Sequence, residues 1–326
     1  MRISLNKKVN RKSFLALLFT SLFALFVALM PWASLRSSPY YDRANYVYFM
    51  DEAVNKLHWF DFDGFVSKLV NEWGWHKFLL FSTETLGLSS GPLIFFITFL
   101  SIFTASIFLS KRYSIVSILL LLNPLYIDFV ASQLRLAFAM SIIFIGYYLY
   151  QKKNLLYIPI LLVTPFIHTS AVLFIFIIGA ALLLSGNKTI YPQIKTIISI
   201  LTGFLVALVT GPLMASIVAS LEDRRAEYSD MSSPLLYTIF WLILYLYLLF
   251  RGLYEKTHKH HSFYIAISVL SIVFFNTIMS GYSTRFLAAC FPFVIAALIE
   301  TKGQEKTILF LSYGGFTALL WFFWFT

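Results

Sequence analysis

Long apolar runs recur along the whole chain, and they limit the folds that are open to it. Many of them approach 18 residues, about the length that crosses the ~30 Å hydrocarbon core of a membrane as a helix. Only 12% of the 326 residues are charged, whereas a soluble domain has about 25%. Backbone groups in lipid must be satisfied internally, and the runs are continuous rather than alternating, which favours helices over a closed barrel. We therefore predict an all-α, polytopic integral membrane protein, with one transmembrane domain over residues 1–326.

The first apolar run, Phe14 to Met30, follows five basic residues within the first twelve positions. A basic start before an apolar stretch of this length indicates a signal anchor with a cytoplasmic N-terminus, rather than a cleaved signal peptide. All the runs together predict about eleven transmembrane helices, within a range of about 10–12. The later runs lie at residues 92–109, 114–130, 136–150, 155–184, 194–220, 235–251, 262–280, 286–299 and 307–325.

Residues 155–184 form an apolar run that is too long for one crossing and short for two. Pro165 and His168 stand in its middle, and a proline inside a helix removes a backbone hydrogen bond. We expect a broken helical hairpin of two short helices, whose apex opens into a polar cavity. A single long helix, kinked and tilted, is the alternative.

The distribution of basic residues supports this hairpin through the positive-inside rule. With the N-terminus inside and residues 155–184 crossing twice, the inner loops carry 16 of the 25 Lys and Arg residues. The outer side then holds a loop at residues 31–76, and a short amphipathic segment from His76 to Leu88 is interfacial or re-entrant. This first outer region extends over residues 31–91, and residues 221–234 form a second outer loop.

Under this topology the unusual polar residues lie on the outer side. Arg135 and Arg285 each begin an inward-running helix, whose N-terminus already carries about half a positive charge. Two arginines in such places need an opposing anion, and guanidinium groups fit phosphate oxygens, so the pair predicts an anion site. The alternatives are that the arginines extend to lipid head groups, or that Arg135 pairs with Asp128.

Three further residues are candidates for chemistry. His168, between Ile167 and Thr169 at the expected apex, can exchange a proton near neutral pH or donate to a phosphate. A core histidine bonded to a neighbouring carbonyl is the alternative. Asp42 is a candidate base or hydroxyl ligand, and Glu72 lies among tryptophans of the kind that stack on sugar rings. For both carboxylates the alternative is a solvated charge.

Several other chemistries are disfavoured. His258, His260 and His261 with Glu255 resemble metal ligands by type, but they lie in a basic inner loop with no second ligand group, so we expect no metal. Cys290 is the only cysteine, which excludes an internal disulfide and a cysteine-based metal site. The net charge of +10 reflects the sidedness of the loops rather than binding of nucleic acid. No cofactor is expected.

The polar motifs, taken together, resemble those of the EpsG-like family of Wzy-type polysaccharide polymerases, and the likeness covers roughly residues 40–295. The motifs are Tyr41-Asp42, Glu72, Gln133-Leu134-Arg135-Leu136-Ala137, Ile167-His168-Thr169-Ser170-Ala171 and Arg285-Phe286. The family usually shows Arg-Gln where this chain has Gln133-Leu134-Arg135, a departure that bears on Gln133 more than on Arg135.

The resemblance implies a GT-C-like glycosyltransferase of the bacterial inner membrane that needs no metal. Such an enzyme joins oligosaccharide repeat units carried on undecaprenyl diphosphate, on the periplasmic face, in making O-antigen, capsule or exopolysaccharide. A chain-length regulator protein is a possible partner. The implied roles are catalysis by His168 and Asp42, diphosphate binding by Arg135, Arg285 and Gln133, and weaker substrate binding by Glu72, Arg224, Arg225 and Tyr282.

Three other functions remain as alternatives. An O-antigen ligase, or another lipid-diphosphate transferase, would use the same kind of site. A transporter or flippase for the same lipid-linked sugar would need access from both faces, whereas the polar residues gather on one. A membrane acyltransferase would normally present its reactive histidine to a cytoplasmic donor.

Overall fold

The computed structural model describes residues 11–37, 40–59, 62–213, 235–257, 259–279, 281 and 284–326. These residues contain helices and no strand. Within these residues, six helices are long and apolar enough to cross a membrane, and a seventh crossing is counted if one bent pair is included. By helix length and hydropathy this is a multi-pass membrane protein. The six are α6 (Ser90–Arg112), α8 (Leu134–Gln151), α11 (Pro192–Thr210), α13 (Leu235–Tyr254), α14 (His261–Met279) and α17 (Gly303–Phe325).

Shorter helices occupy the other predicted runs. They are α1 (Arg11–Leu29), η4 (Ile115–Leu121), α7 (Pro124–Ser132), α9 (Tyr157–Ile167), α10 (Ala171–Gly186), α15 (Thr284–Ala289) and α16 (Phe291–Ile299). The helices η4 and α7 are bent by 76° relative to each other. Asn123 caps α7 by accepting a hydrogen bond from Leu125 N at 3.0 Å, and Pro124 lacks the N–H that would continue η4. The end of the run 194–220 lies outside the described residues.

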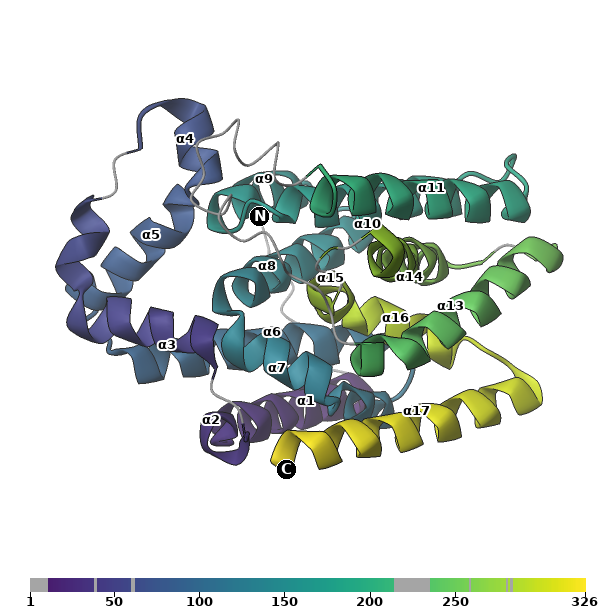
Figure 1. Cartoon of the computed structure of the whole chain (residues 1–326), viewed down its shortest axis with the longest axis horizontal. Helices are drawn as coiled ribbons and strands as arrows, with labels where there is room; N and C mark the ends of the chain where they lie inside the picture. Colours follow the sequence, from purple (N-terminus) through teal and green to yellow (C-terminus); the bar gives the residue numbers. More distant parts are fainter. Residues whose placement is uncertain are drawn as a thin grey trace, which may run out of the picture.

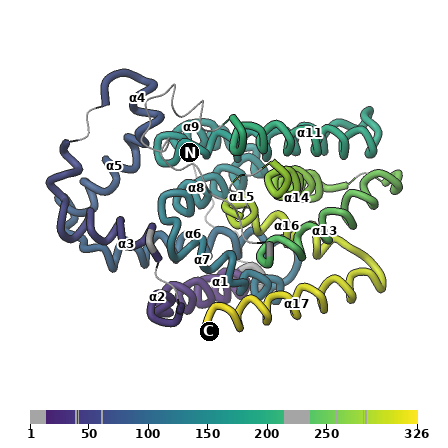
Figure 2. The backbone as a smooth tube through the Cα atoms, viewed as in Figure 1, coloured from purple at the N-terminus to yellow at the C-terminus, as the bar shows by residue number. Residues whose placement is uncertain are grey.

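Contacts between helix ends define two ends of the bundle. Arg112, in the last turn of α6, donates to Glu300 at 2.7 Å and lies 3.2 Å from the ring of His261, the first residue of α14. We call this the opposite end. The site end is the one where α8 begins, and short helices cover it at the left of Figure 1. The C-terminus lies at the site end beside α2 (Trp32–Leu35), where Ser37 N donates to Trp324 O at 3.2 Å (Figure 2).

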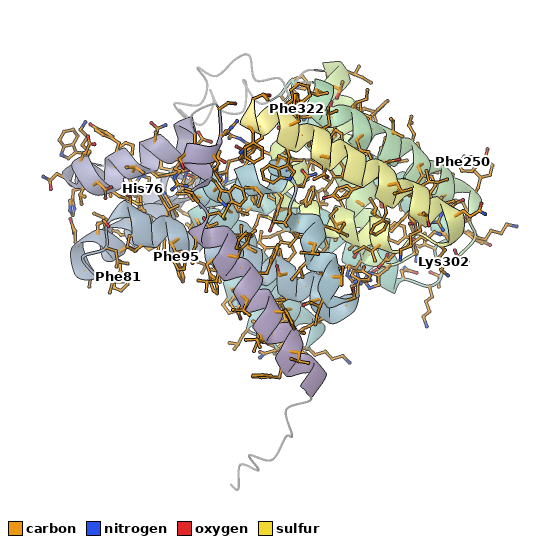
Figure 3. The ribbon with its side chains drawn as sticks, turned by 90° about the horizontal axis from the view of Figure 1, so that it is seen from below. His76, Phe81, Phe95, Phe250, Lys302 and Phe322 are labelled. Atoms are coloured by element: carbon orange, nitrogen blue, oxygen red, sulfur yellow. The ribbon has the colours of Figure 1, made fainter. Side chains whose placement is uncertain are left out.

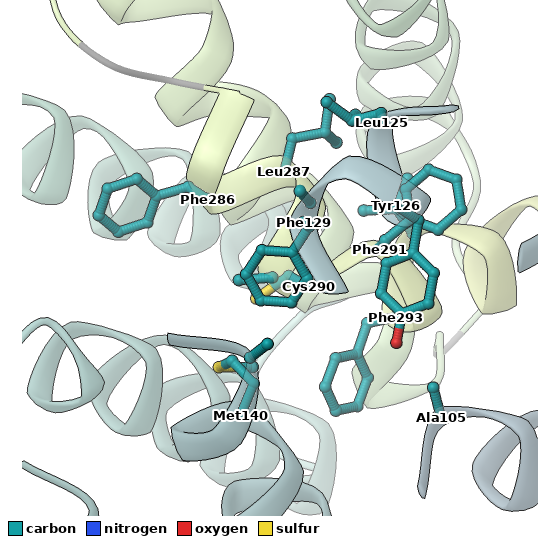
Figure 4. Close-up of a cluster of buried hydrophobic side chains, with 14 of the residues drawn as sticks. Ala105, Leu125, Tyr126, Phe129, Met140, Phe286, Leu287, Cys290, Phe291 and Phe293 are labelled. Carbon is teal, nitrogen blue, oxygen red and sulfur yellow. The ribbon is translucent and has the colours of Figure 1, made fainter. Parts of the chain in front are cut away.

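The buried core is made of aromatic side chains between α7, α8 and α16. Tyr126 stacks on Phe291 with ring centroids 5.4 Å apart, and Phe293 and Met140 lie below them (Figure 4). Where α11 meets α14, small residues replace the aromatics. A Cβ at Gly203 would lie 2.3 Å from the Ser268 carbonyl oxygen, so glycine is what allows the two backbones to approach.

The run at 155–184 forms two short helices, as the sequence predicts, rather than one kinked helix. Leu161 of α9 packs against Gly146, so α9 runs outward along α8 from the opposite end. After α10 the chain is back at that end, since Thr196 of α11 donates to the Gly252 carbonyl at 3.2 Å, and Gly252 lies beside Phe263 in the first turn of α14. The apex consists of His168, which is extended at φ −148° and ψ 119°, and of the two residues that follow it.

Residues 41–85, which we call the arm, cover the site end. The arm contains α3 (Tyr41–Val47), η1 (Tyr48–Glu52), η2 (Val54–Trp59), α4 (Gly64–Val70), α5 (Trp73–Leu80) and η3 (Phe81–Thr85). Asp51 ties it to α6 by accepting hydrogen bonds from the backbone N of Ser90 at 2.8 Å and its Oγ at 2.5 Å. In Figure 3, His76 and Phe81 of the arm lie far from Phe250 and Lys302 of the opposite end.

Candidate functional site

A buried carboxylate joins two of the predicted site residues. Arg135, in the first turn of α8, donates through Nη1 to Glu72 Oε2 and through Nε to the hydroxyl of Tyr46 at 3.0 Å. The other oxygen of the same carboxylate, Oε1, accepts from the backbone N of Thr169 at 3.2 Å and lies 3.5 Å from His168 Nδ1. Glu72 thus contacts the start of α8 and the apex of the hairpin at once.

The backbone around Glu72 explains how the arm reaches the apex. The residue links α4 to α5 in a left-handed conformation, φ 54° and ψ 48°, and only 3% of its surface is exposed. On the other side of the contact, the Thr169 hydroxyl lies within 3.2 Å of the Leu69 carbonyl and 3.3 Å of the Val70 carbonyl. The last turn of α4 is therefore bound to the apex as well.

A second ion pair lies on the neighbouring arm helix. Arg285 Nη2, from α15, donates to Asp42 Oδ2 of α3 at 3.2 Å, and the two side chains are 34% and 43% exposed. Asp42 and Tyr46 stand four residues apart, so they share one face of α3. Because Tyr46 contacts Arg135 while Asp42 contacts Arg285, the two predicted arginines converge on a single helix of the arm.

A third pair was not predicted. Arg36 donates to Asp128 at 2.6 Å and lies over the ring of Tyr40, 4.7 Å from its centroid. The alternative that Arg135 pairs with Asp128 is therefore wrong, because Arg36 holds that carboxylate. Arg43, in α3, donates to the Ala131 carbonyl at 3.4 Å. In the sequence, nothing marks Arg36 and Arg43 as neighbours of α7.

The charges of this region nearly cancel. Among the residues that the structure describes, four arginines and three carboxylates gather here, which gives 4 − 3 = +1 with histidine neutral; they are Arg36, Arg43, Arg135, Arg285, Asp42, Glu72 and Asp128. Tyr46, between the pairs, remains protonated because burial raises the pKa of its hydroxyl. Arg135 opposes that rise, and the charges of Asp42 and Glu72 add to it.

His168 has two hydrogen-bonding arrangements open to it. Ser170 N lies 3.2 Å from His168 Nδ1 and can donate to it when that nitrogen carries no proton. Ser170 Oγ, at 2.8 Å from the same nitrogen, can donate or accept. When the ring is protonated, Nδ1–H can donate to Ser170 Oγ and faces Glu72 Oε1 at 3.5 Å. The side chain is 15% exposed, so solvent reaches part of the ring.

The remaining predicted residues are placed as follows. Gln133 is the corner between α7 and α8, and its side-chain carbonyl is buried without a hydrogen-bond partner among the described residues. Arg224, Arg225 and Tyr282 lie outside the described residues. Among the residues that the structure describes, no three His, Cys, Asp or Glu side chains form a group that could hold a metal ion.

Of the tryptophans around Glu72, Trp75 is buried and packs against Phe138 with ring centroids 6.4 Å apart, whereas Trp73 is 37% exposed. Trp73 is thus the ring of this pair that a ligand can reach. Comparison of the chain with known proteins finds no matching family model, no matching curated protein and no matching solved structure.

Proposed function

We propose that the protein is a membrane glycosyltransferase that polymerises oligosaccharide units carried on undecaprenyl diphosphate. The observation that carries this proposal is the convergence of Arg135 and Arg285 on α3, next to His168, at one end of a membrane bundle. A lipid diphosphate places its charge at the membrane surface, where guanidinium forks can bind phosphate oxygens in pairs. A partly exposed, arginine-rich site at a helix-bundle end suits that leaving group.

The reaction requires three tasks. The acceptor hydroxyl oxygen forms a bond to the anomeric carbon of the donor sugar, the bond from that carbon to the diphosphate oxygen breaks, and the hydroxyl proton passes to a base. Arg135 and Arg285 stabilise the negative charge on the departing lipid diphosphate. To do so they must exchange a carboxylate for phosphate. Arg285 can exchange its carboxylate partner for a phosphate more easily than Arg135 can, because Asp42, the partner of Arg285, is 43% exposed, whereas Glu72, the partner of Arg135, is buried.

His168 is the better of the two candidate bases. Its ring is partly exposed and has a carboxylate oxygen 3.5 Å from Nδ1, an arrangement that stabilises the imidazolium formed when the other ring nitrogen takes a proton. The carboxylate of Asp42 already accepts a hydrogen bond from Arg285, so one of its oxygens is engaged. Asp42 therefore serves better as the exchangeable partner of Arg285 than as a base.

The remaining parts of the proposal concern location and product. We place the protein in the bacterial inner membrane with about eleven crossings, a GT-C-like arrangement and its site end in the periplasm. The polymer is an O-antigen, a capsule or an exopolysaccharide, and a chain-length regulator protein is a possible partner. The positive-inside count supports this orientation.

The test is polymer length on a gel, in a strain that lacks the native gene and expresses each variant at matched levels. Arg285→Ala should leave mostly single repeat units, because loss of one charge-assisted contact to the transition state costs about 100- to 1000-fold in rate. Arg285→Lys should recover only part of this loss, since it keeps the charge without the fork. Lys56→Ala, in the arm but away from the site, is the matched control. Normal long polymer from Arg285→Ala would overturn the proposal.

The same strain separates a polymerase from a ligase. Loss of a polymerase leaves single repeat units attached to their final acceptor, whereas loss of a ligase leaves none attached. Complete absence of attached units in the deletion strain would therefore replace the polymerase by a lipid-diphosphate transferase that uses the same site.

A further inference from the structure

We infer that Glu72 is a positioning residue shared between Arg135 and His168, and that its carboxylate links anion binding at the arginine to proton uptake at the histidine. This inference rests on the proposed function, because it concerns how the same site works. It gives Glu72 a role other than contact with the sugar.

The first argument is that the chain retains a glutamate where the backbone favours glycine. At φ 54° the left-handed conformation places Cβ close to the following carbonyl, which strains a residue that carries a side chain. Asn71, one residue before, is outside that region. A strained residue at a well-packed position points to a use for its side chain. Here the side chain is 4% exposed and fully engaged within the site.

The second argument is that the two carboxylate oxygens have different partners. Oε2 accepts from Arg135, whereas Oε1 lies near His168 Nδ1 and accepts from Thr169 N. The Thr169 contact fixes the carboxylate relative to the apex, so the oxygen near the imidazole stays in place when the arginine changes partner. The single negative charge of Glu72 therefore acts on two groups. Arg135 is always a cation, whereas His168 becomes one when its ring takes up a proton.

Among the described residues, Glu72 is the carboxylate next to His168, and the other ionisable groups around the apex are basic. The elements packed against α9 and α10 at the site end carry Arg135 on α8, Lys68 on α4, and His76 and Lys77 on α5. Arg285 follows on α15, whose Phe286 stacks on Phe174 of α10. All of these are basic. Lys195 of α11 and His261 of α14 lie at the opposite end.

The chemical consequence follows from charge balance. While Arg135 is bound to Glu72, part of the carboxylate's field is neutralised and an arriving phosphate must compete with it. Once a phosphate oxygen takes over the guanidinium, the field of Glu72 acts on His168 and favours its protonation. The hydroxyl proton that leaves the acceptor is then held on the imidazole while the diphosphate departs. Binding of the leaving group thus prepares the base.

The test is Glu72→Gln in the full-length protein in nanodiscs. Undecaprenyl diphosphate is the binding probe, and polymerisation is followed from pH 5 to 8, about the range in which imidazole titrates. Without the competing charge, the probe should bind more tightly, by at least the roughly two- to fivefold that an exposed ion pair contributes. Turnover should fall by about 10- to 100-fold, within what a general base contributes. The acid limb of the pH profile should move to lower pH, because the imidazole has lost a neighbouring negative charge.

If Glu72 has only a structural role, its substitution should instead weaken binding of the probe. Damage to the site would weaken binding and turnover together and leave the acid limb where it is, and that result would overturn the inference. Glu72→Gly, which relieves the backbone strain, serves as a second variant. It should show the same tighter binding and lower turnover if the carboxylate is what matters. Glu52→Gln, exposed elsewhere in the arm, is the matched control. If the unmodified protein neither binds the probe nor polymerises, the proposed function fails, a result separate from failure of the Glu72 inference.

Discussion

Replacing Arg135 or Arg285 by alanine should change stability very differently, although the two residues look alike in the sequence. Arg135→Ala leaves Glu72 with a 4% exposed side chain and without its cation. Removing one partner of a buried ion pair costs about 3–5 kcal/mol. Because the Thr169 N–H still satisfies one oxygen and the Arg135 side chain is 28% exposed, we expect the lower end, about 3 kcal/mol.

Arg285→Ala, by contrast, leaves Asp42 with 43% of its side chain exposed. Water can solvate the Asp42 carboxylate once Arg285 is removed, so the change in the free energy of unfolding should stay within about 1 kcal/mol. The assay is equilibrium unfolding of purified variants in mixed micelles of mild detergent and dodecyl sulfate. The difference of about 2 kcal/mol between the variants corresponds to roughly 30-fold in the unfolding equilibrium, at 1.4 kcal/mol for each factor of ten.

A double variant checks the cause. Adding Glu72→Gln to Arg135→Ala removes the unpaired charge, and it should recover at least about 1 kcal/mol of the loss if the pair is coupled as its geometry indicates. Equal unfolding of the two arginine variants, or no recovery in the double variant, would refute the assignment of Glu72 as the buried partner.

Three more predictions concern packing, pH and sidedness. Gly203→Ala should destabilise the protein by about 1–3 kcal/mol, since the new Cβ would lie 2.3 Å from a carbonyl oxygen of α14. Gly179→Ala is the control, because a Cβ there has nothing within 4 Å and should not destabilise the protein; thermal unfolding compares the two variants. A hydrogen bond from Arg251 lowers the pKa of Glu255 from 4.5 to about 2, so the stability it contributes is complete above pH 4.5 and is lost as the pH falls towards 2. Glu255→Gln should therefore flatten acid unfolding over that interval, as followed by fluorescence. In a background without the native cysteine, an impermeant thiol reagent applied to intact cells should label a cysteine at Trp59 but not one at position 255, and the reverse pattern would invert the topology.

The sequence predicts the apolar helices of the bundle, because each crossing needs an apolar length that few other structures require, but it does not predict the short helices of the arm. It also located the break near His168, since proline and a polar residue interrupt the longest apolar run. The bend between η4 and α7 went unpredicted, although Asn123-Pro124 is a pair that ends helices. The expected crossing at 286–299 likewise proved to be two short helices, and α16 begins one residue before Pro292.

The pairing of charges could not have been predicted in the same way. Arg135 and Glu72 are 63 residues apart, and Arg285 and Asp42 are 243 apart. A periodic pattern in the sequence predicts which face of a helix is buried, but it does not predict which residues lie next to a residue in a loop. Arg36 was missed for this reason, because only the fold brings it to Asp128. Glu72 was read as a loop carboxylate because its burial depends on the arm folding back onto the apex.

The shortness of α9 determines the thickness of the bilayer that this side of the protein can match. Its eleven residues span about 16 Å at 1.5 Å each, roughly half of a ~30 Å hydrocarbon layer. Leu162 and Val163 of α9 are 67% and 53% exposed, so lipid acyl chains contact this short helix directly. Above it, Phe166 contacts Phe65 of α4, itself 69% exposed, with ring centroids 5.7 Å apart. The acyl chains of lipids beside α9 must adopt a shorter or more tilted arrangement, so the bilayer is thinner there and the lipid head groups lie closer to His168. On the proposed function, a polyprenyl carrier brings its polar group to the apex without leaving its leaflet, and the rate of polymerisation in reconstituted membranes should fall as the acyl chains of the host lipid are lengthened.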